Sequence, residues 1–282
     1  RITSATSGTG SARINYTVDA NNGTSSRNGV LTIAGLNFNV TQSGLAPSAR
    51  IDALSQATAL VGTPGLTLTL TGANFTNTAR VRWQGSERAT NFVSATQLSA
   101  VITTADLAAP GTFTIDVFDP PPGGGASNQV SFTVQNPLPQ LTNLNPANRD
   151  AGSGQFTLTV NGSNFVNGAA VRWNGNARAT NFVSATQLTA VIADSDIAAQ
   201  GTATVTVLNP APGGGASGGL TFTINQAPNP VPVLTSLSPN ALAAGGAAFT
   251  LTVNGNSFVS GASVRWNGNA RTTNFVSATQ LT

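Results

Sequence analysis

The chain has 282 residues, of which 40% are hydrophobic and only 7% are charged. It contains no cysteine, histidine, methionine or lysine, which excludes disulfides, a thiol nucleophile and a histidine or lysine general base. The net charge of +3 is spread along the chain and does not predict a nucleic-acid-binding surface, which needs clustered basic residues. No apolar run is long enough to span a bilayer, so we expect no membrane insertion.

The first part of the chain predicts a partial β-domain. A segment of this length is too short for a complete sandwich. We therefore assign residues 1–45 to a partial domain.

The remainder of the chain repeats itself. The string Val-Arg-Trp-x-Gly occurs at residues 81–85, 171–175 and 264–268. The string Asn-Phe-Val-Ser-Ala-Thr-Gln-Leu follows at 91–98, 181–188 and 274–281. A period of roughly ninety residues is too long for one turn of a solenoid and indicates tandem whole domains.

Each repeat predicts many short strands. Apolar residues alternate with threonine at residues 66–70, 156–160 and 249–253, which is typical of a half-buried strand in an antiparallel sheet. Similar alternation occurs at 113–117, 130–134 and 220–224, with Asn-Gly turns and Gly-rich loops between strands. Residues 105–109 and 195–199 are each long enough for one helical turn. The expected fold is all-β, with tandem immunoglobulin-like β-sandwiches.

The predicted organisation is a rod of linked sandwiches. We place repeat 1 at residues 46–135, repeat 2 at 136–227 and a truncated repeat 3 at 228–282. Alternating prolines at residues 136–139 and 228–232 favour extended, stiff linkers. Repeat 3 stops where the earlier copies continue with further strands. We expect a truncated chain; the alternative is that a neighbouring chain supplies the missing strands by β-augmentation.

Several motifs of the repeats resemble those of IPT/TIG domains. They are Leu-x-Pro at residues 144–146 and 237–239, Gly-x-Asn-Phe at 72–75 and 162–165, Val-Arg-Trp, and Asn-Pro-x-Pro-Gly-Gly-Gly at 209–215. The first copy lacks the entry proline, and the third has Gly-Asn-Ser-Phe at 255–258. The resemblance is strongest to multi-copy bacterial surface proteins, and it implies an early-set immunoglobulin-like sandwich.

The leading segment resembles the second half of a BACON domain. The matching residues are 7–10, 14–18, 21–27, 29–35 and 40–42. BACON domains are β-sandwiches often attached to bacterial carbohydrate-active proteins. The resemblance implies a role in binding glycans or mucins.

The sequence does not predict an enzyme. Glycoside hydrolysis needs two facing carboxylates. The close acidic pairs are Asp194 with Asp196 and Asp116 with Asp119, and neither recurs fully in another repeat. A calcium site built on these aspartates is a disfavoured alternative, because no dense Asp/Asn/Gly loop surrounds them. We expect no catalytic, cofactor-binding or metal-binding residues.

The repeated tryptophans, Trp83, Trp173 and Trp266, have two interpretations. Each lies two residues after a valine, so both side chains point to the same face of a strand. We expect that face to be the core; the alternative is an exposed platform for sugar stacking.

Arginines recur in pairs within the three repeats. Each pair straddles a turn, which favours placement of both side chains on one sheet face. One interpretation is a contact ladder along the rod, which would bind anionic glycans or a neighbouring rod. The other is a solubilising outer face that protects an edge strand. The residues are Arg82, Arg88, Arg172, Arg178, Arg265 and Arg271.

These observations favour a non-catalytic structural or adhesive segment of a large extracellular bacterial protein, such as a stalk, adhesin shaft or filament building block. The expected partners are other copies of the chain or other surface proteins, with glycans as a further option and nucleic acid excluded. The alternative function is a glycan-binding accessory region of a secreted carbohydrate-active enzyme.

Overall fold

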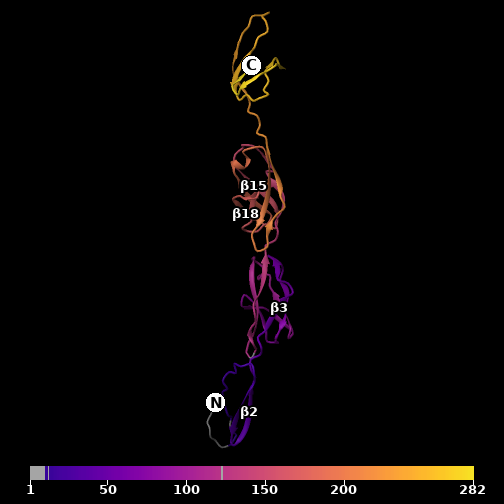
Figure 1. The fold of residues 1–282 in the computed structure, drawn as a ribbon, viewed down its shortest axis with the longest axis vertical. Helices are drawn as coiled ribbons and strands as arrows, with labels where there is room; N and C mark the ends of the chain where they lie inside the picture. Colours follow the sequence, from indigo (N-terminus) through magenta and orange to yellow (C-terminus); the bar gives the residue numbers. More distant parts are fainter. Residues whose placement is uncertain (1–9, 12, 122) are drawn as a thin grey trace.

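The computed structural model describes residues 10–282 apart from 12 and 122, and their regular structure is β except for one short 3-10 helix, η1 (Asp194–Ile197). Figure 1 shows the units in chain order along one long axis, with the two ends of the chain at opposite ends of the molecule. The expected rod of all-β units is therefore the observed arrangement.

Repeat 1 is a sandwich of two sheets. The first sheet has the strand order β3 (Arg50–Leu54), β5 (Leu66–Ala73), β9 (Gln97–Ile102), β8 (Thr90–Ser94). The second has the order β4 (Thr58–Leu60), β12 (Val130–Gln135), β10 (Gly111–Asp119), β6 (Arg80–Trp83), β7 (Ser86–Glu87), with β11 (Gly125–Ala126) paired to β10.

Repeat 2 has the same topology. Its first sheet has the order β13 (Gln140–Asn145), β15 (Phe156–Ser163), β19 (Gln187–Ile192), β18 (Thr180–Ser184). Its second has the order β14 (Asn148–Asp150), β22 (Leu220–Asn225), β20 (Gly201–Asn209), β16 (Ala170–Trp173), β17 (Asn176–Ala177), with β21 (Gly215–Ala216) paired to β20.

The two outer segments contain fewer strands. The leading segment has one antiparallel hairpin, β1 (Arg27–Ile33) with β2 (Leu36–Gln42). Residues 13–20 form no strand, and Tyr16 makes an isolated bridge. Repeat 3 contains β23 (Val233–Ser238), β24 (Thr252–Asn256), β25 (Arg265–Trp266), β26 (Asn269–Ala270), β27 (Phe275–Ser277) and β28 (Gln280–Leu281). Of the two expected helical turns, residues 195–199 overlap η1, and residues 105–109 lie in hydrogen-bonded turns.

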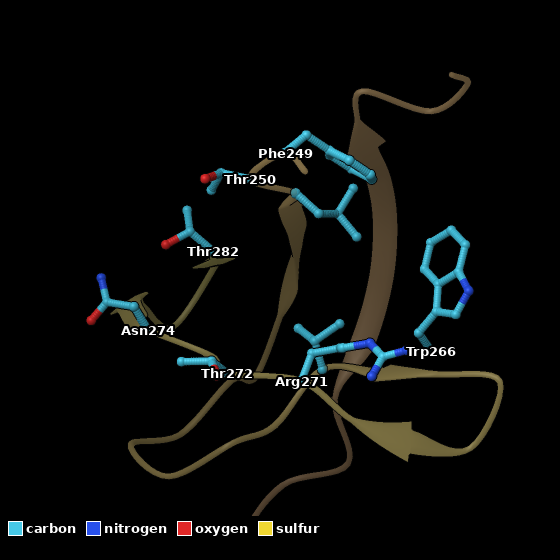
Figure 2. Close-up of a pocket in the computed structure, with 9 residues that line it drawn as sticks. Phe249, Thr250, Trp266, Arg271, Thr272, Asn274 and Thr282 are labelled. Atoms are coloured by element: carbon cyan, nitrogen blue, oxygen red, sulfur yellow. The ribbon is translucent and has the colours of Figure 1, made fainter. Parts of the chain in front are cut away.

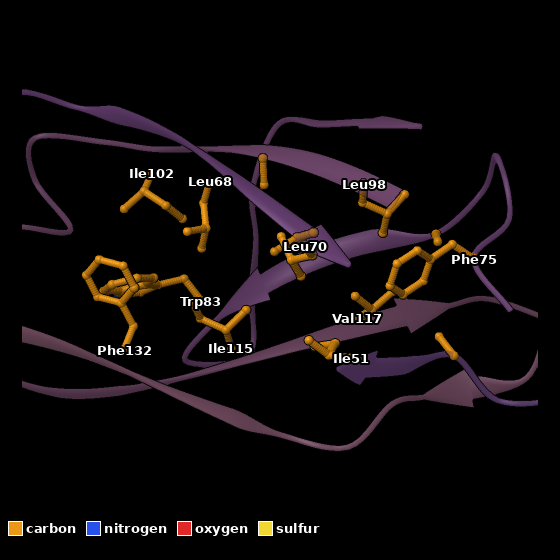
Figure 3. Packing of buried hydrophobic residues seen from close by; sticks show 14 of the residues in the cluster. Ile51, Leu68, Leu70, Phe75, Trp83, Leu98, Ile102, Ile115, Val117 and Phe132 are labelled. Carbon is orange, nitrogen blue, oxygen red and sulfur yellow. The ribbon is translucent and has the colours of Figure 1, made fainter. Parts of the chain in front are cut away.

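Each complete sandwich buries its own apolar core. In repeat 1 the alternation in β5 places Leu68 and Leu70 inside, where they face Ile115 and Val117 of the opposite sheet (Figure 3). Repeat 2 has a separate cluster of the same size. Because the two cores are separate, each repeat has the apolar interior that independent folding needs.

The tryptophan expectation holds for two of the three residues. Trp83 and Trp173 are only 3% and 2% exposed and lie in the cores. For Trp266 the expectation is wrong, because this side chain is 51% exposed. Strands β20 and β22 complete the sheet beside Trp173, and residues 267–282 contain no counterpart of them.

One phenylalanine ring comes from different sheets in the two cores. In repeat 1, Phe113 on β10 stacks on Trp83 with ring centroids 5.0 Å apart. In repeat 2 the corresponding residue is Ala203, and Phe156 on β15 stacks on Phe222 at 5.6 Å. The large ring thus lies on β10 in repeat 1 and on β15, in the opposite sheet, in repeat 2.

This exchange predicts coupling between positions 156 and 203. We expect Ala203→Phe to overpack the core at a cost of about 1–3 kcal/mol. Adding Phe156→Leu recreates the residue pair of repeat 1, so the double variant should lose less stability than the sum of the single variants. Amide hydrogen exchange in β20 measures repeat 2 alone. Strictly additive losses would show that the two positions do not share space.

Candidate functional site

The joint between repeats 1 and 2 is formed by residues 136–139 (Asn-Pro-Leu-Pro), which connect β12 to β13. The sequence predicts a stiff linker here from the two prolines alone. In the structure the linker is also held by hydrogen bonds from both sandwiches.

A single peptide group is shared between the two repeats. The carbonyl of Gln135 accepts a hydrogen bond of 2.9 Å from the backbone N–H of Val61 in repeat 1. The N–H of the same peptide group, which belongs to Asn136, donates to the carbonyl of Pro212 in repeat 2 at 2.8 Å. Since a peptide group is planar, no rotatable backbone bond separates these two contacts.

The Gly-rich loop of repeat 2 encloses Asn136. The N–H of Gly214 donates to the carbonyl of Asn136, and the Asn136 side chain donates to the carbonyl of Pro210, both at 2.8 Å. Asn136 is only 4% exposed as a result. The close approach requires glycine: a Cβ at Gly213, whose φ is +68°, would lie 2.6 Å from the Gln135 Cβ.

Two further asparagines of repeat 2 hold the linker. Asn209, at the end of β20, donates from its side chain to the carbonyls of Pro137 and Asn164 at 2.8 and 2.7 Å. Asn164, in the Gly-x-Asn-Phe motif, donates to the carbonyl of Leu138 at 3.1 Å. The motif residues that carried the family resemblance therefore contact the incoming chain.

In repeat 1 the position that corresponds to Asn209 makes different hydrogen bonds. Asp119 occupies the position of Asn209, and its carboxylate accepts hydrogen bonds from the hydroxyls of Thr76 and Thr78 at 2.8 and 2.6 Å. Asn74 still holds the incoming chain, through the carbonyl of Ser48 at 3.1 Å. At this position repeat 1 therefore has a carboxylate that accepts hydrogen bonds from hydroxyl groups, and repeat 2 has an amide that donates a hydrogen bond to the linker.

The second linker differs from the first. Every residue from 226 to 232 is exposed, and no hydrogen bond holds this stretch within the described part of the chain.

Two of the predicted arginines form the same internal ion pair in successive repeats. Arg88 donates from Nε to Asp106 at 2.9 Å, and Arg178 donates from Nε to Asp196 at 2.8 Å. The hydrogen bond from Arg178 holds the pKa of Asp196 below its usual value. Burial opposes ionisation of Asp106, but hydrogen bonds from Arg88 and Thr103 outweigh it and lower that pKa as well. In repeat 1 the ion pair connects the β9–β10 loop to the residue that follows β7. In repeat 2 it connects the β19–β20 loop to the residue that follows β17.

The other four arginines have different surroundings. Arg82 makes a two-point ion pair with Asp116, with a distance of 2.9 Å from Nε. Arg172 has no carboxylate partner in the described residues. Arg265 is exposed on β25, and Arg271 lines a pocket of repeat 3 with Trp266 and Phe249 (Figure 2). Three of the six arginines are thus engaged internally, and the contact ladder stays a prediction.

Three of the four aspartates considered for chemistry are held by these contacts, and the fourth, Asp194, is exposed. Asp116 and Asp196 are paired with arginines, and Asp119 accepts two threonine hydroxyls. Across the residues that the structure describes, no three acidic side chains cluster as metal ligands would. No helix in this part of the chain is long and apolar enough to cross a membrane.

The fold defines a class of protein made of tandem immunoglobulin-like sandwiches. The IPT/TIG domain family model matches residues 49–134, 139–224 and 232–282. The chain belongs to this family, and the expected fold class is confirmed. The BACON-like assignment of the leading segment lies outside the matched residues and stays a prediction.

Comparison with individual proteins adds only distant matches. No curated protein matches the chain. A structure solved with a xylogluco-oligosaccharide is 17% identical, with 83% of this chain and 53% of that chain covered and a TM-score of 0.38. The chain thus spans about half the length of that protein.

Two further matches are surface glycan-binding proteins. SGBP-B from a xyloglucan utilization locus of Bacteroides uniformis is 17% identical, with 64% and 50% of the two chains covered and a TM-score of 0.27. PbSGBP-B of Prevotella bryantii is 12% identical, with 63% and 41% covered and a TM-score of 0.37. No functional conclusion follows from likeness at this level.

The shared peptide predicts a narrow distribution of distances between repeats 1 and 2. The chain has no cysteine, so Thr67→Cys and Thr157→Cys place single spin labels at equivalent exposed positions of the two repeats. We expect Gly213→Ala to broaden the distribution of distances between the two spin labels, because the added Cβ displaces Gln135 and Asn136. Pulsed electron paramagnetic resonance measures this distribution. Gly218→Ala is the control, since a Cβ there meets nothing within 4 Å. A broad distribution in the parent chain would contradict the clamp.

The Arg178–Asp196 pair predicts a pH-dependent contribution to stability. Because folding lowers the pKa of Asp196, the pair stabilises the fold above the unfolded-state pKa of about 3.9 and loses its effect as pH falls through the lower folded-state value. Asp196→Asn should cost roughly 1–3 kcal/mol at pH 7, and the difference from the parent should shrink below about pH 4. Urea titration followed by NMR signals of repeat 2 measures this. Asp194→Asn, at an exposed position, is the control; a cost for Asp196→Asn that does not change with pH would refute the assignment.

Proposed function

We propose that this chain is a non-catalytic structural spacer in a large extracellular bacterial protein, serving as part of a stalk, adhesin shaft or filament. The observation that carries the proposal is the peptide group shared by repeats 1 and 2, which fixes the direction of one sandwich relative to the next. This property suits a spacer at the first joint, because a free joint would shorten the mean reach of the chain. The second linker, residues 226–232, is not held in this way.

The surface composition supports an extracellular setting. Threonine, serine and asparagine supply the outward-facing residues of many strands, and charged residues are few. With no cysteine or methionine, the chain has no sulfur side chain to oxidise. Its stability comes from packing in the separate cores rather than from cross-links.

The glycan-binding alternative lacks an aromatic platform in the two complete repeats. Trp83 and Trp173 are buried, and the large exposed aromatic side chains of these sandwiches are Phe92 and Phe182, one on an edge strand of each. Single rings one repeat apart offer less stacking surface than a cluster of rings, so the structural role is the better supported function.

Small-angle X-ray scattering of the whole chain tests the proposal. A compact fold of 282 residues would have a radius of gyration of about 19 Å, and we expect roughly twice this value for the rod. A radius of gyration near that of the compact fold would contradict the proposed spacer function. Sedimentation at increasing concentration checks the associated expectation that copies of the chain pair with one another.

A further inference from the structure

Repeat 3 has an open apolar pocket at one end of its core. The pocket has a volume of about 580 Å³, and Phe249 and Trp266 stand on two of its sides (Figure 2). Both rings are exposed in the free chain. Further along the same sheet, Val253 is buried with Phe258 and Leu281, so the core is closed there and open at the pocket.

Repeat 2 shows what covers the same place in a complete sandwich. Phe249 and Trp266 occupy the repeat positions of Phe156 and Trp173. In repeat 2 the ring of Phe222, on β22, lies with its centroid 5.6 Å from that of Phe156 and 5.0 Å from that of Trp173. The pocket of repeat 3 is therefore the place that the antiparallel strands β20 and β22 cover in repeat 2.

The leading hairpin, β1 with β2, carries the side-chain pattern of these two strands. In all three cases the register places glycine opposite a branched aliphatic residue, then an apolar residue opposite phenylalanine, then two aliphatic residues opposite each other. The pairs in the hairpin are Gly29–Val40, Leu31–Phe38 and Ile33–Leu36. Those in repeat 2 are Gly201–Ile224, Ala203–Phe222 and Val205–Leu220. Those in repeat 1 are Gly111–Val134, Phe113–Phe132 and Ile115–Val130.

The apolar face of the hairpin is not covered in the free chain. Residues directly opposite each other in a register share a face, so the pairs of the hairpin form one apolar face. On this face Leu36 is exposed and Phe38 is 51% exposed. Residues 16–19 and the hairpin line a cavity of about 410 Å³, so they do not pack into a closed core.

Hydrogen bonding in repeat 2 fixes the edge by which β20 joins the sheet. The N–H of Asn174 donates to the carbonyl of Thr204 at 2.9 Å. The backbone groups of the next residue, Val205, which faces Trp173, therefore point away from β16 and toward β22. Val205 and Leu220 are thus a hydrogen-bonded pair.

The hairpin has the same hydrogen-bonding phase. Ala34 and Gly35, with φ values of 50° and 78°, form its two-residue turn. Such a turn makes the flanking residues, Ile33 and Leu36, a hydrogen-bonded pair. With its apolar face toward the core, β1 therefore presents its free edge to β25 in the way that β20 presents its edge to β16.

The direction of the chain is also compatible. In repeat 2, β22 is followed by residues 226–232 and then by repeat 3; in the leading segment, β2 is followed by residues 43–49 and then by repeat 1. A hairpin with β2 in the place of β22 thus directs its own repeat 1 onward, beyond repeat 3. Because the leading hairpin and repeat 3 lie at opposite ends of the molecule (Figure 1), a hairpin in the pocket belongs to a second copy.

We propose that the leading hairpin of one copy of this chain occupies the repeat 3 pocket of the next copy, where it takes the place of the strands that correspond to β20 and β22. Phe38 takes the position of Phe222, between Phe249 and Trp266. The contact joins two different surfaces and does not close on itself, so successive copies form a linear filament. This inference rests on the extended shape in the proposed function.

Sedimentation of whole-chain variants tests the contact. Phe38→Asp blocks the hairpin and Trp266→Asp blocks the pocket; both side chains are exposed, so the cores of repeats 1 and 2 stay intact. We expect the mean mass of the parent to rise with concentration beyond that of a dimer, and each variant to stay monomeric. An equimolar mixture of the two variants should form dimers and nothing larger, because it contains one intact hairpin and one intact pocket per pair. Asn37→Asp, on the opposite face of the hairpin, is the control and should associate as the parent does.

Other pairings give other results in the same experiment. Association of Phe38→Asp alone would show that two copies of repeat 3 pair with each other, and association of Trp266→Asp alone would show that two hairpins do. Either result, or a parent chain that stays monomeric, would overturn the proposal. Scattering from monomeric Phe38→Asp tests the extended shape separately, so a failure of the contact is distinguished from a failure of the spacer function.

Disulfide formation between copies tests the register. Asn174 and Thr204 are in contact in repeat 2, since the Asn174 side chain accepts a hydrogen bond of 2.8 Å from the Thr204 N–H. The corresponding residues in the filament contact are Asn267 and Thr32. We expect Asn267→Cys and Thr32→Cys chains to cross-link when mixed, because facing residues of paired strands lie within disulfide reach. Thr41→Cys, on the other strand of the hairpin, is the control; cross-linking as strong as that of Thr32→Cys would contradict the proposed seating.

Discussion

The arrangement of the two complete sandwiches depends on the peptide group between Gln135 and Asn136. Its carbonyl is bonded to repeat 1 and its N–H to repeat 2, so the two units are attached to opposite edges of one plane. The peptide bond resists rotation, and both groups would otherwise need water or another partner. The prolines that follow only continue a direction that these hydrogen bonds have already set. A spacer built in this way keeps its length without a large interface between its units.

The two sandwiches differ by sets of neighbouring changes rather than by single ones. Phe113 with Leu66 in one core becomes Ala203 with Phe156 in the other. Asp119, which accepts two hydroxyl groups, becomes Asn209, which donates to two carbonyls. The first set does not conserve volume, because leucine with phenylalanine becomes phenylalanine with alanine. The second set leaves the Oδ1 of Asn209 buried without a hydrogen-bond partner. At Arg172 both neighbouring acidic residues of repeat 1 are replaced by uncharged ones, and its buried Nε also has no hydrogen-bond partner.

The fold could be read from the sequence because its signals are local. Alternation of apolar residues and threonine predicts the strands, and the valine two residues before Trp83 and Trp173 predicts that these tryptophans are buried. The joint could not be predicted, because it pairs Asn136 with a loop more than seventy residues further along the chain. The ion pair of Arg178 with Asp196 likewise depends on how the turn and η1 meet in space. Trp266 was misplaced for a related reason: burial of that face needs strands from both sheets, and the motif alone does not supply them.

The most direct test of the account is the relative orientation of repeats 1 and 2 in solution. Residual dipolar couplings of backbone amides in weakly aligned samples give an alignment tensor for each repeat separately. If the shared peptide fixes the joint, the two tensors must agree in magnitude and in direction when both sandwiches are placed as in Figure 1. Tensors that differ in magnitude or direction would mean that the two sandwiches move independently, and the rod would not exist at this joint.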